Sequence, residues 1–179
     1  MQLISEREIS VRIHSELYES NITLFNDKNT GYAIPKVTQS PEPQVFDMVS
    51  LATYTDDGKY ISISYIESVE TGLDGSKTTI FFKKDDPYIV SMLREGAVST
   101  NLVFEQDKRC QCVYKTPYMP FELCVHTKKI SNTLFEGGCI DLDYVVEIRG
   151  AQAERNKFKL TITSDKNEPK VYWGESRFR

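Results

Sequence analysis

The sequence predicts an all-β protein that folds as a single closed antiparallel β-barrel of about eight to ten strands. Apolar and polar residues alternate along most of the chain, which is the two-residue period of a strand with one buried face. Short turns rich in glycine, aspartate and proline separate these runs, and no window of about eleven residues has a convincing helical period. The runs make up more than half of the 179 residues, and a sheet of that size avoids open, aggregation-prone edges by closing on itself.

The predicted strands follow one another in order, each bounded by residues that favour turns. The Asp-Gly pair at 57–58 is a strong hairpin signal because glycine accepts a positive φ, and a second glycine-rich turn covers 72–75. The Asp-Asp-Pro run at 85–87 is predicted to end a strand, because proline cannot donate to a ladder. The runs predicted as strands are 9–18, 45–55, 59–68, 78–84, 88–94, 98–106, 110–116, 121–130, 140–148 and 157–162.

Two stretches depart from this alternation. Residues 19–44 are rich in asparagine and proline and are predicted to be a long loop, whose five apolar residues suggest that it folds over the domain as a lid. Residues 165–179 are predicted to be a polar tail, either loose or docked on the barrel through Tyr172 and Trp173. The chain therefore divides into a barrel domain, 1–164, and a C-terminal tail.

Composition and charge disfavour several classes of function. The 22 lysines and arginines against 26 aspartates and glutamates give a net charge of −4 and a pI near 5.3, which disfavours a nucleic-acid-binding face. The first residues carry charges and no apolar run follows, so no signal peptide is predicted. No apolar stretch is long enough for a transmembrane helix. We therefore expect a cytoplasmic protein with no membrane or nucleic-acid partner.

The cysteines and histidines of the sequence do not have the spacing of a metal site or of a catalytic site. The expected thiols do not have the paired Cys-x2–4-Cys spacing of structural zinc; they are Cys110, Cys112, Cys124 and Cys139. His14 and His126 both face outward on their predicted strands. Cys124 and His126 share a face, but side chains at that spacing stand roughly 7 Å apart, and no third group orients them. We predict no cofactor, no metal and no catalytic residue, and an enzyme is the least favoured interpretation.

Six polar residues are predicted to face the interior of the barrel. On several strands the inward apolar stripe ends in a charged or hydroxylated residue of the same parity. Burial of an unpaired carboxylate or guanidinium is costly, so these groups must pair with one another or bind something. The predicted set is Tyr65, Glu67, Arg94, Tyr114, Thr127 and Tyr144.

Two hypotheses account for this set. In the first, Arg94 anchors the carboxylate or phosphate of a small amphipathic or anionic ligand, in a cavity of at least about 300 Å³, and all six residues are candidate ligand-binding residues. In the second, Glu67 and Arg94 form a buried ion pair in a filled barrel, which serves as a structural or protein-interaction module and forms a homodimer or binds a partner through its outer face.

The interior residues also form motifs that resemble a known family. The motifs are Tyr65-x-Glu67, Arg94-x-Gly96, Phe104, Tyr114-x-Thr116-Pro117, Thr127 and Gly138-x-Ile140-x-Leu142-x-Tyr144. In this order they resemble the YwiB-like family of small bacterial proteins of unknown function. The resemblance implies a calycin, or lipocalin-like, β-barrel in the bacterial cytoplasm, and it implies no activity.

Overall fold

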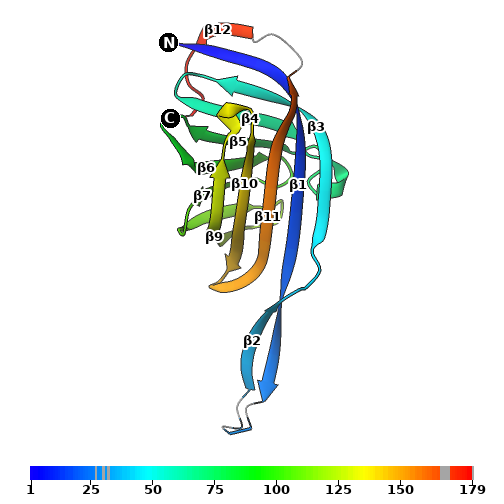
Figure 1. Cartoon of the computed structure of the whole chain (residues 1–179). Helices are drawn as coiled ribbons and strands as arrows, with labels where there is room; N and C mark the ends of the chain where they lie inside the picture. The colour runs from blue at the N-terminus through cyan, green and yellow to red at the C-terminus, as the bar shows by residue number, and fades with distance from the viewer. Residues whose placement is uncertain (27, 30, 32, 166–169, 179) are drawn as a thin grey trace.

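A computed structural model describes residues 1–178 apart from 27, 30, 32 and 166–169; among strand residues, the side chains of 22–26, 33–35 and 165 are also left out. The described residues form twelve strands (Figure 1). They are β1 (Gln2–Asn26), β2 (Ala33–Gln39), β3 (Gln44–Asp56), β4 (Tyr60–Ile66), β5 (Lys77–Lys83), β6 (Asp86–Glu95), β7 (Thr100–Glu105), β8 (Arg109–Lys115), β9 (Pro120–Asn132), β10 (Cys139–Ile148), β11 (Ala151–Asp165) and β12 (Lys170–Gly174).

Two short 3-10 turns, η1 (Val69–Thr71) and η2 (Leu134–Glu136), accompany the strands, and the described chain contains no α-helix. No helix in this part of the chain is long and apolar enough to cross a membrane.

Ten of the described strands run around one nearly closed antiparallel barrel, in the order β7-β6-β5-β4-β3-β1-β11-β10-β9-β8. The predicted fold class is therefore confirmed. The two ends of this order meet at a seam between β7 and β8. Within the described residues a single bridge pairs these strands: the Ser99 N–H donates to the Lys115 carbonyl at 3.0 Å, and the Lys115 N–H donates back at 2.9 Å.

β1 is the strand on which the rest of the sheet is built. It pairs antiparallel with β3 on one side and with β11 on the other. Its N-terminal end also pairs with β12, and its C-terminal end pairs with β2. A single strand of 25 residues therefore joins both halves of the barrel and both of the strands that lie outside it.

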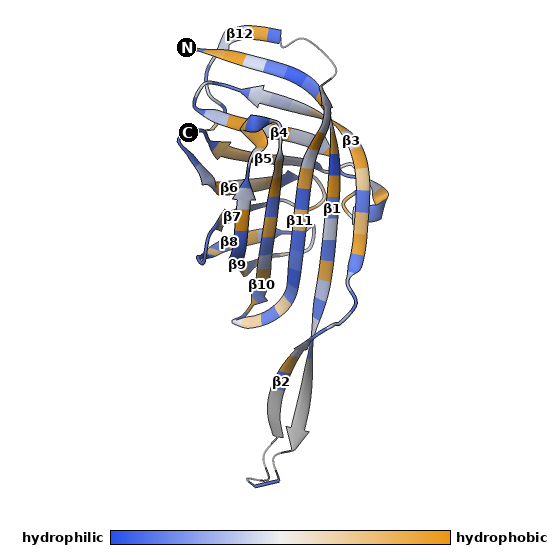
Figure 2. Ribbon diagram, viewed as in Figure 1, coloured by the Kyte–Doolittle hydropathy of each residue, from blue (hydrophilic) through white to orange (hydrophobic). Residues whose placement is uncertain are grey.

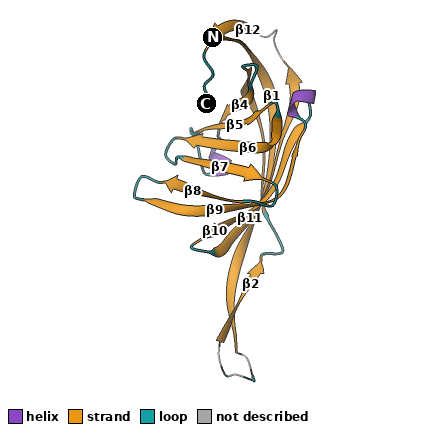
Figure 3. Ribbon diagram, turned by 90° about the vertical axis from the view of Figure 1, so that its left-hand side faces the viewer, coloured by secondary structure: helices purple, strands orange, loops and turns teal. Residues whose placement is uncertain are grey.

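The prediction of a long loop over 19–44 was wrong. β1 continues to Asn26, β2 returns along it, and the resulting hairpin projects beyond the barrel (Figures 1 and 3). Pro35 falls within β2, which tolerates proline because it is an edge strand. The structure does not describe the five apolar side chains that were expected to cover the domain. They are Ile22, Leu24, Phe25, Tyr32 and Ile34.

Two hairpin turns differ from their predicted positions. Arg149 and Gly150 both have a positive φ, which makes a two-residue turn between β10 and β11. β11 therefore begins at Ala151, six residues before the predicted run. Pro87 lies inside β6 near its start rather than in the turn before it.

The C-terminal segment is docked on the barrel, and of the two side chains expected to hold it Tyr172 makes a contact, because its hydroxyl donates to the Glu6 carboxylate of β1 at 3.3 Å. β12 adds to β1 by backbone pairing, while Trp173 remains 68% exposed. Beyond β12, the ring of Phe178 stacks on Phe81 with centroids 4.1 Å apart, and the Ser176 hydroxyl donates to the buried carboxylate of Asp57. Residues 166–169 and 179 of the predicted tail lie outside the described residues.

The interior is filled with side chains at one end of the barrel. Hydrophobic and hydrophilic residues alternate along the strands (Figure 2), and the apolar parity points inward. Ile61, Phe82, Val90 and Phe104 are each at most 2% exposed. Leu134 of η2 packs into the same cluster and is 2% exposed. This packed core supports the opposite end, where the interior is hollow.

Candidate ligand-binding cavity

A cavity of about 490 Å³ occupies the end of the barrel away from the packed core. Its walls are mostly apolar and include Leu17, Phe46, Leu102, Leu123 and Phe158. Sites for small molecules are mostly apolar concavities of roughly 300–1,000 Å³ with a few placed polar groups. The cavity is thus larger than the minimum of about 300 Å³ that the ligand hypothesis requires. The filled interior expected under the alternative hypothesis is not found at this end of the barrel.

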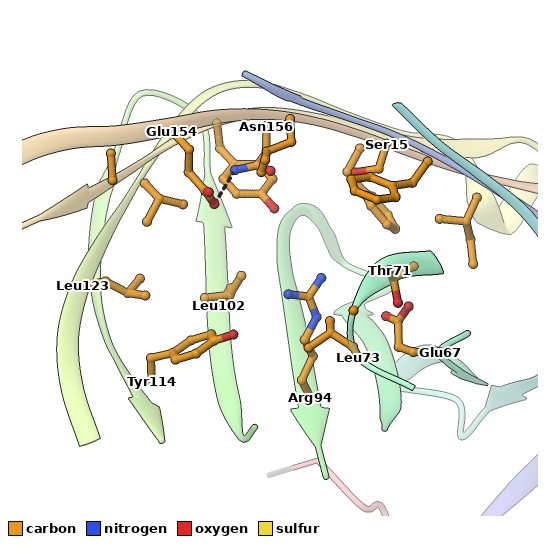
Figure 4. A pocket seen from close by; sticks show the side chains of 18 of the residues that line it. Ser15, Glu67, Thr71, Leu73, Arg94, Leu102, Tyr114, Leu123, Glu154 and Asn156 are labelled. Carbon is orange, nitrogen blue, oxygen red and sulfur yellow. Dashed lines mark hydrogen bonds between the residues drawn. The ribbon is translucent and has the colours of Figure 1, made fainter. Parts of the chain in front are cut away.

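Five of the six predicted interior residues line this cavity: Tyr65, Glu67, Arg94, Tyr114 and Tyr144. Figure 4 labels Glu67, Arg94 and Tyr114 among them. The five residues reach the cavity from β4, the β4–β5 connection, β6, β8 and β10. Their inward parity is the reason that strands far apart in sequence bring them together.

Thr127 does not line the cavity, although it faces inward as predicted. It is fully buried beside Tyr144 in the register of β9 and β10. Its backbone holds the β7–β8 turn, because its carbonyl accepts from Asp107 N–H and its own N–H donates to the Lys108 carbonyl, both at 3.1 Å. Thr127 is therefore part of the packed interior.

Glu67 is buried in the connection that follows β4 and is 5% exposed. The hydroxyl of Thr78, which is itself fully buried, donates to its carboxylate at 2.6 Å. Its backbone N–H donates to the Ser76 carbonyl at 2.9 Å, which fixes the start of the connection. The ion pair with Arg94 considered from the sequence is not formed between these two described residues; the Glu67 carboxylate is bonded to Thr78, which the register places between Tyr65 and Arg94.

Arg94 extends from β6 into the cavity (Figure 4). It is flanked in the ladder by Thr78 of β5 and Thr100 of β7. Its Nε is buried and has no hydrogen-bond partner among the described residues. A buried guanidinium donor without an acceptor is costly, and a bound carboxylate or phosphate would supply one.

The two buried tyrosines lie within the electrostatic influence of Arg94. Burial raises the pKa of Tyr144 to about 12, while the positive charge of Arg94 acts in the opposite direction. Burial and the Glu67 carboxylate also raise the pKa of Tyr65, again against Arg94. Both phenols are therefore neutral hydroxyl groups at physiological pH, available to donate or accept a hydrogen bond.

The wall across from Arg94 carries two polar residues that the sequence prediction missed. Glu154 and Asn156 both extend from β11 into the cavity, and the Asn156 amide donates to Glu154 Oε1 at 2.9 Å (Figure 4). They share the parity of Phe158, so extending the predicted strand backwards by three residues would have found them.

The β4–β5 connection covers part of this cavity. Thr71 and Leu73 from the segment around η1 line it, whereas none of the described residues from 19 to 44 does. The described residues of 19–44 therefore do not form the predicted lid, and the β4–β5 connection covers the cavity in their place.

Gly96 sets how closely β6 approaches this connection. A Cβ at Gly96 would lie 2.8 Å from Ser76 Cβ and 2.9 Å from Ser76 Cα. Ser76 is 1% exposed and its carbonyl holds the N–H of Glu67, so it has little room to move. Gly96→Ala is expected to destabilise the protein by about 1–3 kcal/mol in urea unfolding because of this overpacking.

Ser76→Gly supplies the matched test of that prediction. It removes the Cβ and hydroxyl that a methyl group added at Gly96 would meet, so the double variant should recover part of the lost stability. Unchanged stability of Gly96→Ala would contradict the close approach.

The side chains considered for nucleophilic chemistry lie outside the cavity. Cys124 and His126 occupy the outer parity of β9, near Glu147. Burial, together with the Glu147 carboxylate, raises the pKa of the Cys124 thiol. A raised pKa leaves little thiolate, so the arrangement does not activate a nucleophile.

Comparison with known proteins supports the fold and the family. A family model described as a domain of unknown function, DUF1934, matches residues 34–160. The crystal structure of the YwiB protein from Bacillus subtilis is similar with a TM-score of 0.61 and 19% sequence identity, and the match covers 89% of this chain and 94% of that chain. No curated protein matches the sequence. The resemblance to the YwiB-like family is confirmed, and the calycin-like barrel that it implies fits the nearly closed barrel described above.

Proposed function

Because the chain belongs to the DUF1934 family and has a hollow barrel with an arginine inside whose buried Nε has no acceptor in the part of the chain that the structure describes, we propose that it binds a small amphipathic or anionic ligand in the cavity. Arg94 carries the proposal, since its buried Nε has no acceptor among the described residues. The acidic group of the ligand would meet Arg94, and its apolar part would lie against the aliphatic and aromatic wall.

The other polar residues have supporting roles in this proposal. The hydroxyls of Tyr65, Tyr114 and Tyr144 would complete the hydrogen bonds of the ligand's polar end. Glu67 is already bonded to Thr78 and would help to hold the arginine side of the cavity in place. Thr127 has no direct role, because it lies in the packed interior. The proposed setting is the bacterial cytoplasm, as the family resemblance implies.

Arg94→Met is expected to lower the affinity for octanoate and octyl phosphate at least about tenfold, because it removes the charged donor and keeps a flexible apolar side chain of similar length. Isothermal titration calorimetry with the full chain measures this, and circular dichroism checks that the barrel is still folded. Native mass spectrometry of the purified protein would also detect a small molecule retained in the wild type and lost in the variant.

Arg109→Met is the matched control, since Arg109 is exposed on β8 and pairs with Glu147 away from the cavity. It should bind both probes as the wild type does. If Arg94→Met unfolds the protein, Arg94→Gln removes the charge but keeps a polar side chain, and allows the binding test to be made. Unchanged affinity in a folded Arg94 variant would refute the proposal.

One observation favours the alternative of an interaction module. The outward side chains of β3 include three exposed apolar residues: Val45, Val49 and Leu51 are 55%, 69% and 54% exposed. Large exposed apolar patches commonly mark interaction sites. Sedimentation velocity over a range of concentrations distinguishes self-association from a monomeric binding protein.

A further inference from the structure

Arg94 and Glu154 stand on opposite walls of the same cavity. In the order of the ten barrel strands, β6 is second and β11 is seventh, so five positions, half of the circumference, separate them. Both side chains reach the cavity between these walls (Figure 4). A ligand that spans the cavity would therefore meet a guanidinium at one end and a carboxylate at the other.

The charges that line the cavity do not balance. Among the described lining residues, Glu67, Arg94 and Glu154 are the charged ones, which gives a formal charge of −1. Glu67 is bonded to Thr78, whereas Glu154 accepts from Asn156 through Oε1 and its Oε2 accepts from no described residue. One donor on Arg94 and one acceptor on Glu154 are thus left for a ligand.

The two free groups select the charge type of the ligand. A simple acid would satisfy Arg94 but would raise the negative charge of the cavity to −2, in surroundings where charges interact strongly. A simple amine would meet Glu154 and would neutralise the formal charge of the cavity, but it would leave the buried Arg94 donor on the opposite wall without an acceptor. A molecule with both groups satisfies each wall and leaves the total charge unchanged.

We infer that the ligand is a small zwitterion, whose acidic group binds Arg94 and whose amino group binds Glu154 on the opposite wall. This inference rests on the proposed function and names the class of ligand. Tyr144 lines the same cavity, and its phenol lies within the electrostatic influence of both Arg94 and Glu154. Leu102, Leu123 and Phe158 form the wall between them, so the part of the ligand that joins the two groups is apolar.

Matched probes separate the contributions of the two ends. The set consists of ω-amino acids from 4-aminobutanoate to 8-aminooctanoate, with the fatty acid and the alkylamine of each length. Calorimetry on the full chain should find one ω-amino acid that binds at least about tenfold more tightly than its matched acid and its matched amine, because only the zwitterion satisfies both walls.

Glu154→Gln removes the negative charge and keeps the shape of the side chain. It should reduce the affinity for the preferred ω-amino acid at least about tenfold, while the matched fatty acid binds as tightly as before or more tightly. Glu122→Gln, on the exposed outer face of β9, is the control and should change neither affinity.

The outcomes distinguish this inference from the function on which it rests. Fatty acids that bind as tightly as the ω-amino acids, or an unaffected Glu154→Gln, would overturn the zwitterion and leave an acid-binding barrel. If no acid, amine or ω-amino acid of any length binds, both the inference and the proposed function are overturned.

Discussion

Phe104→Ala is expected to destabilise the protein by about 3–5 kcal/mol, the range for removing a fully buried aromatic ring. Phe104 is 0% exposed in β7, and its ring lies 4.8 Å from that of Tyr144, centroid to centroid. It therefore supports a cavity-lining tyrosine from the packed side of the interior. Phe104 also lies on a strand at the seam. In the described residues only the Ser99–Lys115 bridge pairs this side of the barrel with β8, so few backbone hydrogen bonds there hold β7 in place when the packing of the ring is removed.

Urea unfolding followed by circular dichroism measures this effect. Phe135→Ala is the control, since Phe135 is 54% exposed in η2 and should change stability by no more than about 0.5 kcal/mol. A loss below about 1 kcal/mol for Phe104→Ala would contradict the close packing of the interior beneath the cavity.

Stability is expected to fall steeply above pH 10, because two buried tyrosines must remain neutral in the folded state. Burial raises the pKa of Tyr144 from 10 to about 12, and burial also raises the pKa of Tyr65. A tyrosine whose pKa is higher in the folded state than in the unfolded state contributes its full stabilisation at pH values below the unfolded-state pKa. That contribution is lost as the pH rises through the folded-state pKa. For Tyr144 the loss between pH 10 and 12 is about 2–3 kcal/mol.

The free energy of unfolding from urea titrations between pH 9 and 12 tests this prediction, with tyrosinate absorbance followed in parallel. The double variant with Tyr65→Phe and Tyr144→Phe should show a much shallower decline, because it removes both hydroxyls that resist ionisation. Tyr118→Phe is the control, since Tyr118 is 96% exposed. An equally steep decline in the double variant would show that the buried phenols are not responsible.

Alternation predicted the barrel strands well because the face of a side chain in a sheet follows directly from its parity. All ten predicted runs correspond to strands of the barrel. The same rule placed Tyr65, Arg94 and Tyr144 in one interior although they come from three distant strands. Parity does not set depth along the barrel axis, however, and for this reason Thr127 faces inward but lies in the packed part.

The remaining differences come from strand ends and pairings, which local pattern does not specify. The true start of β11 depends on positive φ at Arg149, a conformation that side chains rarely adopt, so Glu154 and Asn156 were missed. The hairpin formed by β1 and β2 contains residues typical of loops, because an edge strand tolerates them. Local pattern also does not reveal that the Glu67 carboxylate bonds to Thr78 of β5 rather than to Arg94.

The pairing of β1 constrains how this chain reaches its folded state during synthesis. β1 leaves the ribosome well before one of its two barrel neighbours, β11, which starts only at Ala151. The edge of β1 on that side stays unpaired until β11 has been translated, and contacts so distant in sequence form slowly. The nascent barrel must therefore keep a long strand edge from aggregating before it can close.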